Sequence, residues 1–147
     1  MSAKGDVVRR LFKAVEERAP YVLDCYAEDI EIHEAESLPY GGVYRGHDGA
    51  QRHIAGWRGT WERFQTDAER RLDAVFIDGE GDTVAAVFHH RAVDPGSGRR
   101  FDAPEVGIYD VRGGKVVRSQ MFHADTAALL RFLAETEDRA SRARRGT

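Results

Sequence analysis

Two glutamates and a histidine lie close together at the end of a short apolar segment. The sequence IEIHEAE at 30–36 alternates apolar and polar residues, which is the period of a β-strand, and it contains His33, Glu34 and Glu36. A carboxylate buried at a strand end has a raised pKa and can exchange a proton near neutral pH. Because neighbouring strand residues point to opposite faces, we expect Glu34 inside and His33 and Glu36 outside. A surface acid on an edge strand is the alternative reading of Glu34.

A second candidate lies near the end of the chain, in the strand-like segment at 115–124. Histidine titrates near neutral pH, so His123 is suited to act as an acid or a base. Its face of the strand also carries Val117, Ser119 and Met121, whose modest sizes fit the lining of a concave surface. A core histidine bonded to the backbone is the other interpretation of His123.

The preceding strand-like segment, 100–111, places Glu105 and Tyr109 on one face. An acid on a buried face has to be paired or functional. Arg91 and Arg100 are the neutralising partners that we expect for Glu105.

Further candidates for a pocket wall come from a helix, a loop and another strand. His53 and Trp57 lie one turn apart on a helix, where ordinary packing against a sheet is the alternative. Tyr40 lies in a turn-rich loop, where its hydroxyl could reach a substrate at the pocket mouth or simply be solvated. Alternation allows only one of the adjacent His89 and His90 to face the pocket; His89 is included in the predicted lining, with His90 as the alternative.

The remaining chemical motifs give no sign of a cofactor. The six histidines match no compact metal-ligand spacing, so we expect neither a metal nor a cofactor. Neither a glycine-rich phosphate loop after a strand nor a G-x-S-x-G sequence is present. Cys25 has no evident base partner and is expected to be a small buried residue.

Composition and charge exclude several classes of protein. The 147 residues carry a formal net charge of −3 and a pI near 6.1, so we expect no nucleic-acid or anionic-membrane partner. A single cysteine permits no intramolecular disulfide, which fits a reducing compartment. Neither a signal peptide nor a run of 18 apolar residues is apparent, and we therefore expect a cytoplasmic protein.

The hydrophobic pattern predicts a single α+β domain over 1–138. Amphipathic periodicity and turn residues predict helices at 6–18, 21–26, 47–64 and 126–139, strands at 30–34, 66–78, 82–93, 100–111 and 115–124, and a loop at 35–46. Helices followed by strands in hairpins favour a curved antiparallel (mixed) sheet, wrapped as a cone around three N-terminal helices, with a short C-terminal helix. The basic residues 139–147 are expected to form a disordered tail.

Three stretches resemble the nuclear transport factor 2-like superfamily, and within it the SnoaL-like polyketide cyclases and the ketosteroid isomerases. They are CYAEDIEIHEAESLPYGGVYRGHDGAQRHI, YDVRGGKVV and MFHADTAALL. The resemblance covers most of the chain and implies the cone-shaped fold. It is weak on function, because this fold carries isomerases, dehydratases, hydrolases, cyclases and proteins without catalytic activity.

The resemblance also implies positions for catalytic residues. It aligns Glu34 with the catalytic carboxylate of ketosteroid isomerases and His123 with a pocket-lining position. The isomerase's oxyanion-binding tyrosine falls on Leu11 and its aspartic acid on or beside Val106, with Glu105 the nearest acid. Without the tyrosine, steroid isomerisation is disfavoured.

The sequence thus predicts a cofactor-independent enzyme that uses Glu34 and His123 as acid and base. Its expected reaction is cyclisation or isomerisation of a small, apolar, polyketide-like substrate. Dehydration or epoxide opening in the same pocket is the alternative, although the Asp-Arg-Asp arrangement of epoxide hydrolysis has no evident counterpart. A non-catalytic ligand-binding or dimerisation module is a third reading. We expect a homodimer that forms through the open face of the sheet.

Overall fold

The computed structural model describes residues 2–146, without the side chains of 137–140. In chain order its elements are α1 (Ala3–Glu17), η1 (Pro20–Cys25), β1 (Tyr26–Glu34), β2 (Gly42–Arg45), α2 (Gly46–Trp61), η2 (Glu62–Phe64), α3 (Asp67–Arg70), β3 (Val75–Asp78), β4 (Thr83–Val93), β5 (Arg100–Arg112), β6 (Lys115–His123) and α4 (Thr126–Arg145). The predicted α+β class is confirmed.

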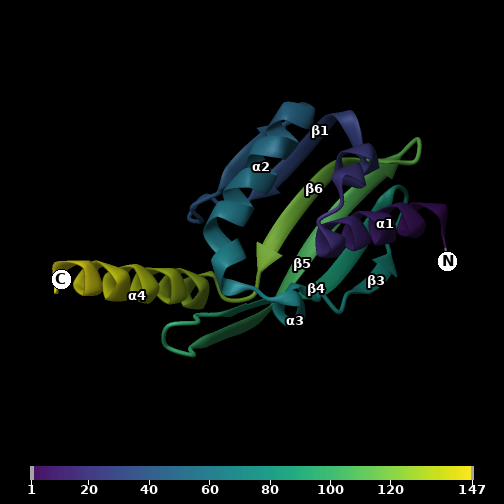
Figure 1. Cartoon of the computed structure of the whole chain (residues 1–147). Helices are drawn as coiled ribbons and strands as arrows, with labels where there is room; N and C mark the ends of the chain where they lie inside the picture. Colours follow the sequence, from purple (N-terminus) through teal and green to yellow (C-terminus); the bar gives the residue numbers. More distant parts are fainter. Residues whose placement is uncertain (1, 147) are drawn as a thin grey trace.

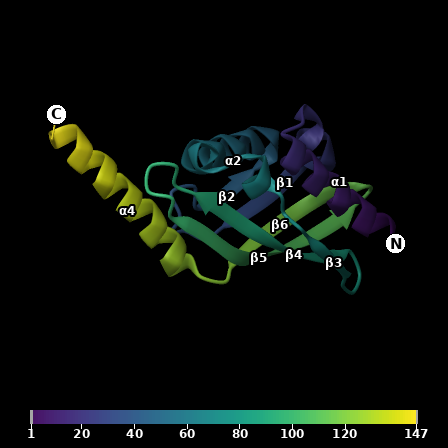
Figure 2. The same ribbon diagram turned by 60° about the horizontal axis from the view of Figure 1, so that its bottom comes forward.

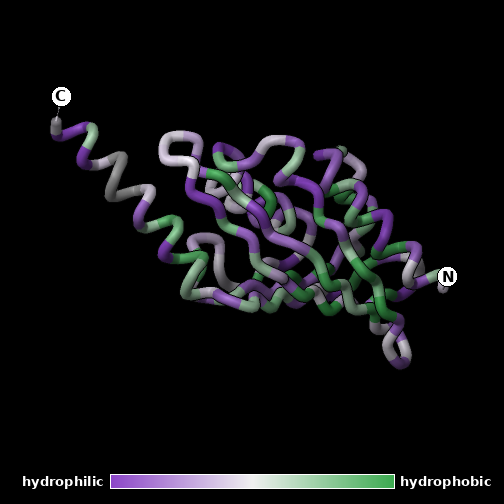
Figure 3. The backbone as a smooth tube through the Cα atoms, turned by 90° about the horizontal axis from the view of Figure 1, so that it is seen from below, coloured by the Kyte–Doolittle hydropathy of each residue, from purple (hydrophilic) through white to green (hydrophobic). Residues whose placement is uncertain are grey.

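One curved sheet of six strands forms the body of the molecule, in the order β2-β1-β6-β5-β4-β3. Strands β3 to β6 form the predicted antiparallel hairpins, whereas β1 pairs with β6 in parallel. Helices α1 and α2 lie over the same face of this sheet, and the sheet does not close on itself (Figures 1 and 2). Buried and more exposed residues alternate along β4, as expected for a sheet with one covered face. Hydrophobic and hydrophilic stretches are interspersed along the chain (Figure 3).

Helix α1 anchors the main hydrophobic core. The Ser2 side chain accepts a hydrogen bond from the backbone N–H of Gly5 and so begins the helix. Phe12 packs edge-on against Phe76, Phe88 and Tyr109, with ring centroids 5.0 to 5.7 Å apart. Burial of one such ring stabilises the fold by about 1.5 to 3 kcal/mol.

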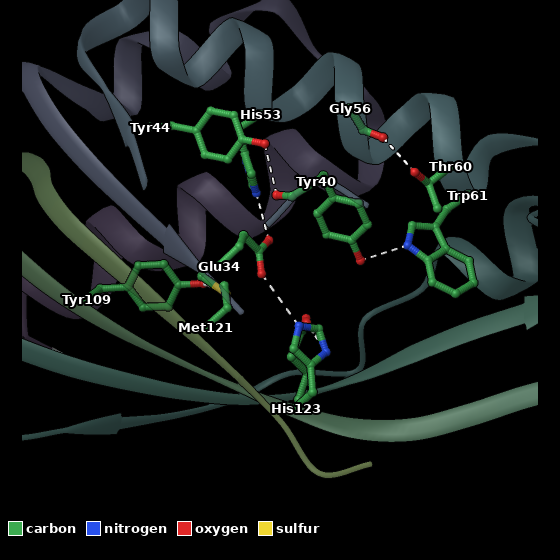
Figure 4. Close-up of polar contacts among 11 residues, drawn as sticks. Glu34, Tyr40, Tyr44, His53, Gly56, Thr60, Trp61, Tyr109, Met121 and His123 are labelled. Atoms are coloured by element: carbon green, nitrogen blue, oxygen red, sulfur yellow. Dashed lines mark hydrogen bonds and ion pairs between the residues drawn. The ribbon is translucent and has the colours of Figure 1, made fainter. Parts of the chain in front are cut away.

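A second hydrophobic cluster closes the other end of the covered face. It contains Leu38, Tyr40, Trp61, Phe64, Ala92, Phe101, Leu129, Phe132 and Leu133. Trp61 is fully buried, and its indole N–H donates to the Tyr40 hydroxyl at 2.8 Å (Figure 4). Helix α2 continues through Gly56 and Gly59 to reach this cluster, although the glycines suggested an earlier end. At Gly56 a Cβ atom would lie 3.1 Å from the Cβ of Tyr40, so the glycine allows close packing.

Three local predictions differ from the structure. Residues 42–45 form the edge strand β2 inside the expected loop, because they pair with β1. The expected strand at 66–78 is interrupted by α3, which a capping box of Thr66 and Glu69 begins. Helix α4 continues to Arg145, through residues expected to be a disordered tail. The predicted boundary at 138 therefore falls inside a helix; alanine and arginine are good helix formers, and basic residues favour a helix C-terminus.

The face of the sheet that the helices leave open carries a cross-strand apolar row. Val75, Val87, Val106 and Phe122 are in register across β3, β4, β5 and β6. Val75 is 61% exposed and Phe122 is 49% exposed. Contiguous exposed apolar surface is common at the interaction sites of proteins. Within the described part of the chain, the helices lack the combination of length and apolar character that crossing a membrane requires.

Candidate active site

Glu34 ends β1 and points to the helix-covered side of the sheet. It follows Ile30 and Ile32 on the same face, and the exposed fractions of Glu34, Ile30 and Ile32 are 9%, 0% and 1%, respectively. His33 points the other way, where its ring Nε2 lies 3.0 Å from Oε1 of Glu31. Strand alternation alone therefore separates the buried acid from its neighbours in sequence.

Glu34 belongs to a chain of four hydrogen-bonded side chains, which we call the Glu–His network. Helix α2 supplies His53, whose Nε2 lies 2.7 Å from Oε2 of Glu34. Strand β6 supplies His123, whose Nε2 lies 3.5 Å from Oε1 of Glu34 (Figure 4). The other ring nitrogen of His123, Nδ1, lies 2.9 Å from Oε1 of Glu105 on β5. The order of the network is thus His53, Glu34, His123, Glu105.

Sheet topology brings these residues together from distant parts of the sequence. The parallel pairing of β1 with β6 sets His33 beside Gln120 and so leads Glu34 towards His123. The antiparallel register of β5 and β6 places Glu105 directly opposite His123. The contact between Glu34 and His123 joins residues that are 89 positions apart.

The environment shifts the pKa values of the two glutamates in opposite directions. Burial by itself would raise the pKa of Glu34, but hydrogen bonds from His123 and His53 outweigh it and lower that pKa. Burial raises the pKa of Glu105, and the hydrogen bond with His123 only partly offsets the rise. Burial alone would lower the pKa of His123, but hydrogen bonds with Glu105 and Glu34 raise it to about 10. At neutral pH, Glu34 is therefore ionised and the His123–Glu105 pair retains a proton.

The network borders a cavity of about 150 Å³. A cavity of this size accommodates a molecule about as large as benzene. The predicted site residues that line it are Glu34, His53, Trp57, His89, Glu105, Tyr109, Ser119 and Met121. Towards the surface the lining includes the partly exposed Arg18, Arg58, Glu69 and Arg70.

Two predicted site residues take other positions. His123 does not belong to the lining; its side chain, 4% exposed, touches both cavity-lining glutamates. Tyr40 was expected at the pocket mouth, and this was wrong: it is 2% exposed and bonded to Trp61 in the second cluster. The loop that carries Tyr40 folds inward because Leu38 and Tyr40 are both apolar enough to fill that cluster.

His89 and His90 face opposite sides of β4, and the deeply buried one is His90. His90 is 4% exposed and lies on the same face as Phe88, whereas the His89 ring is 44% exposed and bonds to Asp102 at 3.0 Å. His89 borders the cavity, but its imidazole is turned to the acid outside it. Both histidines therefore border the cavity, and the inward-facing ring is that of His90, the alternative to His89.

Arg91 is not the partner of Glu105, which contradicts the sequence-based expectation. Its guanidinium lies 2.9 Å from Asp73 and 3.4 Å from Asp102. This is an Asp–Arg–Asp cluster, yet its carboxylate side chains are about half exposed and none of the three residues lines the cavity. Glu105 obtains its stabilising cation from His123 instead.

Three buried residues on the cavity wall have side-chain polar atoms without a hydrogen-bond partner among the described residues. These atoms are both ring nitrogens of His90, the hydroxyl of Ser119, which is 1% exposed, and Oε1 of Gln65, whose amide nitrogen is paired. Buried polar atoms in folded proteins are almost always paired with protein, water or ligand. His90, named from the sequence as the alternative to His89, is therefore a candidate for ligand contact.

His90, Glu105 and His123 also have the spacing that a metal ion would need. One ligand atom from each lies within 4.8 Å of the others, and both histidine and carboxylate are ligands of divalent metals. In the structure, Nδ1 of His123 is bonded to Oε1 of Glu105. A metal would have to displace the proton that they share. The absence of a resident metal remains a prediction.

The two buried histidines predict a stability maximum near pH 6.5. Burial, followed by the charge of His123, lowers the pKa of His90 from its ordinary value of 6.5 to about 3. The unfolded chain thus binds this proton more readily, and stability falls as the pH drops from 6.5 towards 3. His123 has the opposite shift, to about 10, so its contribution is complete below 6.5 and is lost as the pH rises through 10.

Thermal unfolding across this pH range checks the prediction. His90→Gln is expected to flatten the acid side of the profile only, with His89→Gln on the outer face as the matched control. If the stability of His90→Gln fell below pH 6.5 as steeply as that of the wild type, the loss of stability in acid would not come from His90.

Comparison with known proteins agrees with this fold. An NTF2-like protein of unknown function from Burkholderia pseudomallei is 25% identical, with a TM-score of 0.75, over 90% of this chain and 98% of that one. TerC, crystallised with polyporic acid, is 20% identical with a TM-score of 0.76, over 90% and 99% of the two chains. A candidate polyketide cyclase from Xanthomonas campestris pv. campestris is 19% identical with a TM-score of 0.68, over 91% and 96%. A comparison with curated proteins gave no match.

The sequence itself matches a family over most of its length. Residues 8–119 match the SnoaL-like domain, and this range contains most of α1, all strands up to the middle of β6, and three of the four residues of the Glu–His network. The resemblance noted in the sequence is thereby confirmed: the chain belongs to the SnoaL-like domain family.

Proposed function

We propose that this protein is an enzyme that catalyses proton transfer on a small, largely apolar molecule with an acidic C–H beside a carbonyl. The observation that carries the proposal is a pair of cavity-lining glutamates with pKa values shifted in opposite directions. Such a divergence separates a base from an acid within one site. Ketosteroid isomerases divide the two roles between carboxyl groups in the same way, although with different residues.

Each residue of the Glu–His network has a distinct role in this reaction. Glu34, ionised and at the cavity wall, removes the proton from carbon, and the electron pair moves to the carbonyl oxygen. Glu105 shares the retained proton with His123, and in the form that carries this proton it donates a hydrogen bond to the resulting enolate. His123 touches both glutamates and positions them, so that the proton taken by one can be replaced at the other.

The lowered pKa of Glu34 makes it a weak base towards carbon. Abstraction from carbon therefore depends on stabilising the enolate, more than on the strength of the base. A largely apolar lining supports this, because hydrogen bonds to a developing charge are stronger where water is excluded.

Two outcomes of the enolate are compatible with the site. Reprotonation at another carbon gives isomerisation, and attack on a second carbonyl of the same molecule gives cyclisation, with the proton passing to the new alkoxide. Membership of the SnoaL-like domain family and similarity to candidate polyketide cyclases favour cyclisation of a polyketide-like substrate.

Dehydration in the same cavity is the alternative, favoured by the histidines His53 and His90 on its wall. Epoxide opening lacks an Asp–Arg–Asp cluster in the cavity, because the one that includes Arg91 lies outside it.

Hydrogen–deuterium exchange tests the proposal without knowledge of the natural substrate. Small aryl ketones and β-diketones are incubated with the protein in D₂O, and deuterium uptake beside the carbonyl is followed by NMR. We expect exchange above that of buffer and of heat-denatured protein for at least one compound that fits the cavity. Exchange at the buffer rate for the whole panel would count against proton abstraction from carbon.

We also propose that two copies associate through the apolar row of β3 to β6. Phe122→Glu places a charge at the row, and it is expected to convert a dimer into a monomer in light scattering at micromolar concentration. Val15→Lys, at an exposed valine on α1, is the matched control and should leave the dimer intact. A monomeric wild-type protein under these conditions would contradict the proposal.

A further inference from the structure

The most unusual polar group in the cavity outside the Glu–His network is His90. It is 4% exposed, it lines the cavity, and neither ring nitrogen has a hydrogen-bond partner in the part of the chain that the structure describes. A neutral imidazole has one N–H donor and one acceptor, so two buried hydrogen-bonding atoms are left unsatisfied. Leaving such groups unpaired destabilises the folded protein, and a ligand in the cavity that pairs with them would recover this loss.

Aromatic side chains hold the His90 ring in place. Trp61 packs edge-on with a centroid distance of 4.2 Å, Phe101 lies at 5.5 Å and Trp57 at 5.9 Å. Because these rings come from both α2 and β5, they confine the imidazole from two sides. A hydrogen-bonding group held this way needs no reorganisation when a ligand binds.

The surroundings keep His90 uncharged. The charged or titratable groups facing it are His123 on β6, at 6.4 Å between ring centroids, Glu105 on β5, and Glu34 on β1. Burial and the charge of His123 lower the His90 pKa to about 3, against a smaller opposing effect of Glu34. At neutral pH, His90 is thus a neutral donor and acceptor, and it does not compete with Glu34 for the proton from carbon.

His90 and Glu105 are close enough to share one ligand atom. A nitrogen of His90 and an oxygen of Glu105 lie within 4.8 Å of each other. An oxygen atom placed between them can be about 2.8 Å from both, which is an ordinary hydrogen-bond length.

We propose that His90 is a second hydrogen-bond donor for the substrate oxygen, acting beside Glu105. The inference rests on the proposed function, because the oxygen concerned is the carbonyl that becomes the enolate. It also narrows the substrate class: a planar ketone or phenol whose oxygen enters the cavity first. Two donors on one oxygen stabilise the enolate more than the starting ketone, since charge develops on that oxygen.

Phenols test this arrangement because they present an oxygen like that of an enolate without requiring any reaction. The probes are 4-nitrophenol and nitrobenzene, which differ by the hydroxyl group, and binding is measured by calorimetry. The wild-type protein is expected to bind 4-nitrophenol on the order of tenfold more tightly than nitrobenzene. His90→Leu should remove most of this preference without weakening nitrobenzene, whereas His90→Gln, which keeps an N–H donor, should retain it.

Three controls separate the alternatives. His33→Leu, at a partly exposed histidine that does not line the cavity, should leave both affinities unchanged. Glu34→Gln should keep the preference for 4-nitrophenol. If the wild-type protein preferred the phenol but catalysed no deuterium exchange, the proposed reaction would be refuted and the role of His90 in binding would stand. Titration of EDTA-treated protein with Zn²⁺ tests the metal alternative: stoichiometric, micromolar binding that His90→Leu abolishes would overturn the proposal.

A direct readout on the wild-type protein covers the case in which His90→Leu does not fold. In protein labelled with ¹⁵N-histidine, the His90 ring signals are expected to shift on addition of 4-nitrophenol but not of nitrobenzene, with His90→Gln used for assignment. Equal affinity of the wild type for the two probes, or ring signals that do not respond, would overturn the inference.

Discussion

Replacing Glu34 with glutamine is expected to lower the rate of deuterium exchange by roughly two to four orders of magnitude, the usual contribution of a general base. Glutamine has nearly the same shape and can still bond to His53 and His123, so the fold should be retained. It cannot accept the proton from carbon. The rate is measured with the ketone that exchanges fastest in the wild-type protein.

The neighbouring Glu36 provides a matched control. It lies two residues further along the chain, it is exposed, and it does not line the cavity. Glu36→Gln should leave exchange unchanged. If Glu34→Gln exchanged as fast as Glu36→Gln, Glu34 would not be the base.

Replacing His123 with phenylalanine is expected to lower the free energy of unfolding by about 3 to 5 kcal/mol, the usual cost of removing one partner from a buried ion pair. His123 touches both Glu34 and Glu105, and all three side chains are less than a tenth exposed. Phenylalanine fills the space but leaves Glu105 without its partner. Urea unfolding at neutral pH measures the change.

A double variant separates charge from packing. In His123→Phe with Glu105→Gln, the uncompensated carboxylate is gone, and we expect part of the lost stability to return. His33→Phe, at a partly exposed histidine bonded to Glu31, should cost less than about 1 kcal/mol. A double variant less stable than the sum of the two single changes would show that packing, rather than the buried charge, determines the loss.

The fold could be predicted largely from residue periodicity and turn residues. Strands β4, β5 and β6 begin and end within one residue of their predicted bounds, because short turn-rich linkers such as 94–98 separate clear alternating segments. Strand β2 was missed since four residues give no measurable alternation, and its pairing with β1 depends on tertiary structure.

The position of Glu34 followed from alternation, but its bonds did not. Strand parity placed it with Ile30 and Ile32, whereas the contact with His53 depends on how α2 crosses β1, which sequence spacing does not encode. The partnership of Glu105 with His123 depends on the register of β5 and β6. Charge alone favoured an arginine as the partner of Glu105.

The inward direction of His90 was available in the sequence. Val84, Ala86 and Phe88 are buried at every second position of β4, and His90 continues that series. The apolar residues of the segment thus identify the covered face, and the same alternation places the His89 side chain on the opposite face. Tyr40 offered no such signal, because loop residues have no period.

The parallel pairing of β1 with β6 has a consequence for how the protein is made. Glu34 is synthesised early, yet its partner His123 follows 89 residues later, at the end of the last strand. Closing a loop of this length is a slow step in folding, and contacts between such distant residues form late. A growing chain on the ribosome therefore carries β1 with one edge unpaired until almost the whole domain has emerged. The Glu–His network is consequently complete only when synthesis is nearly finished.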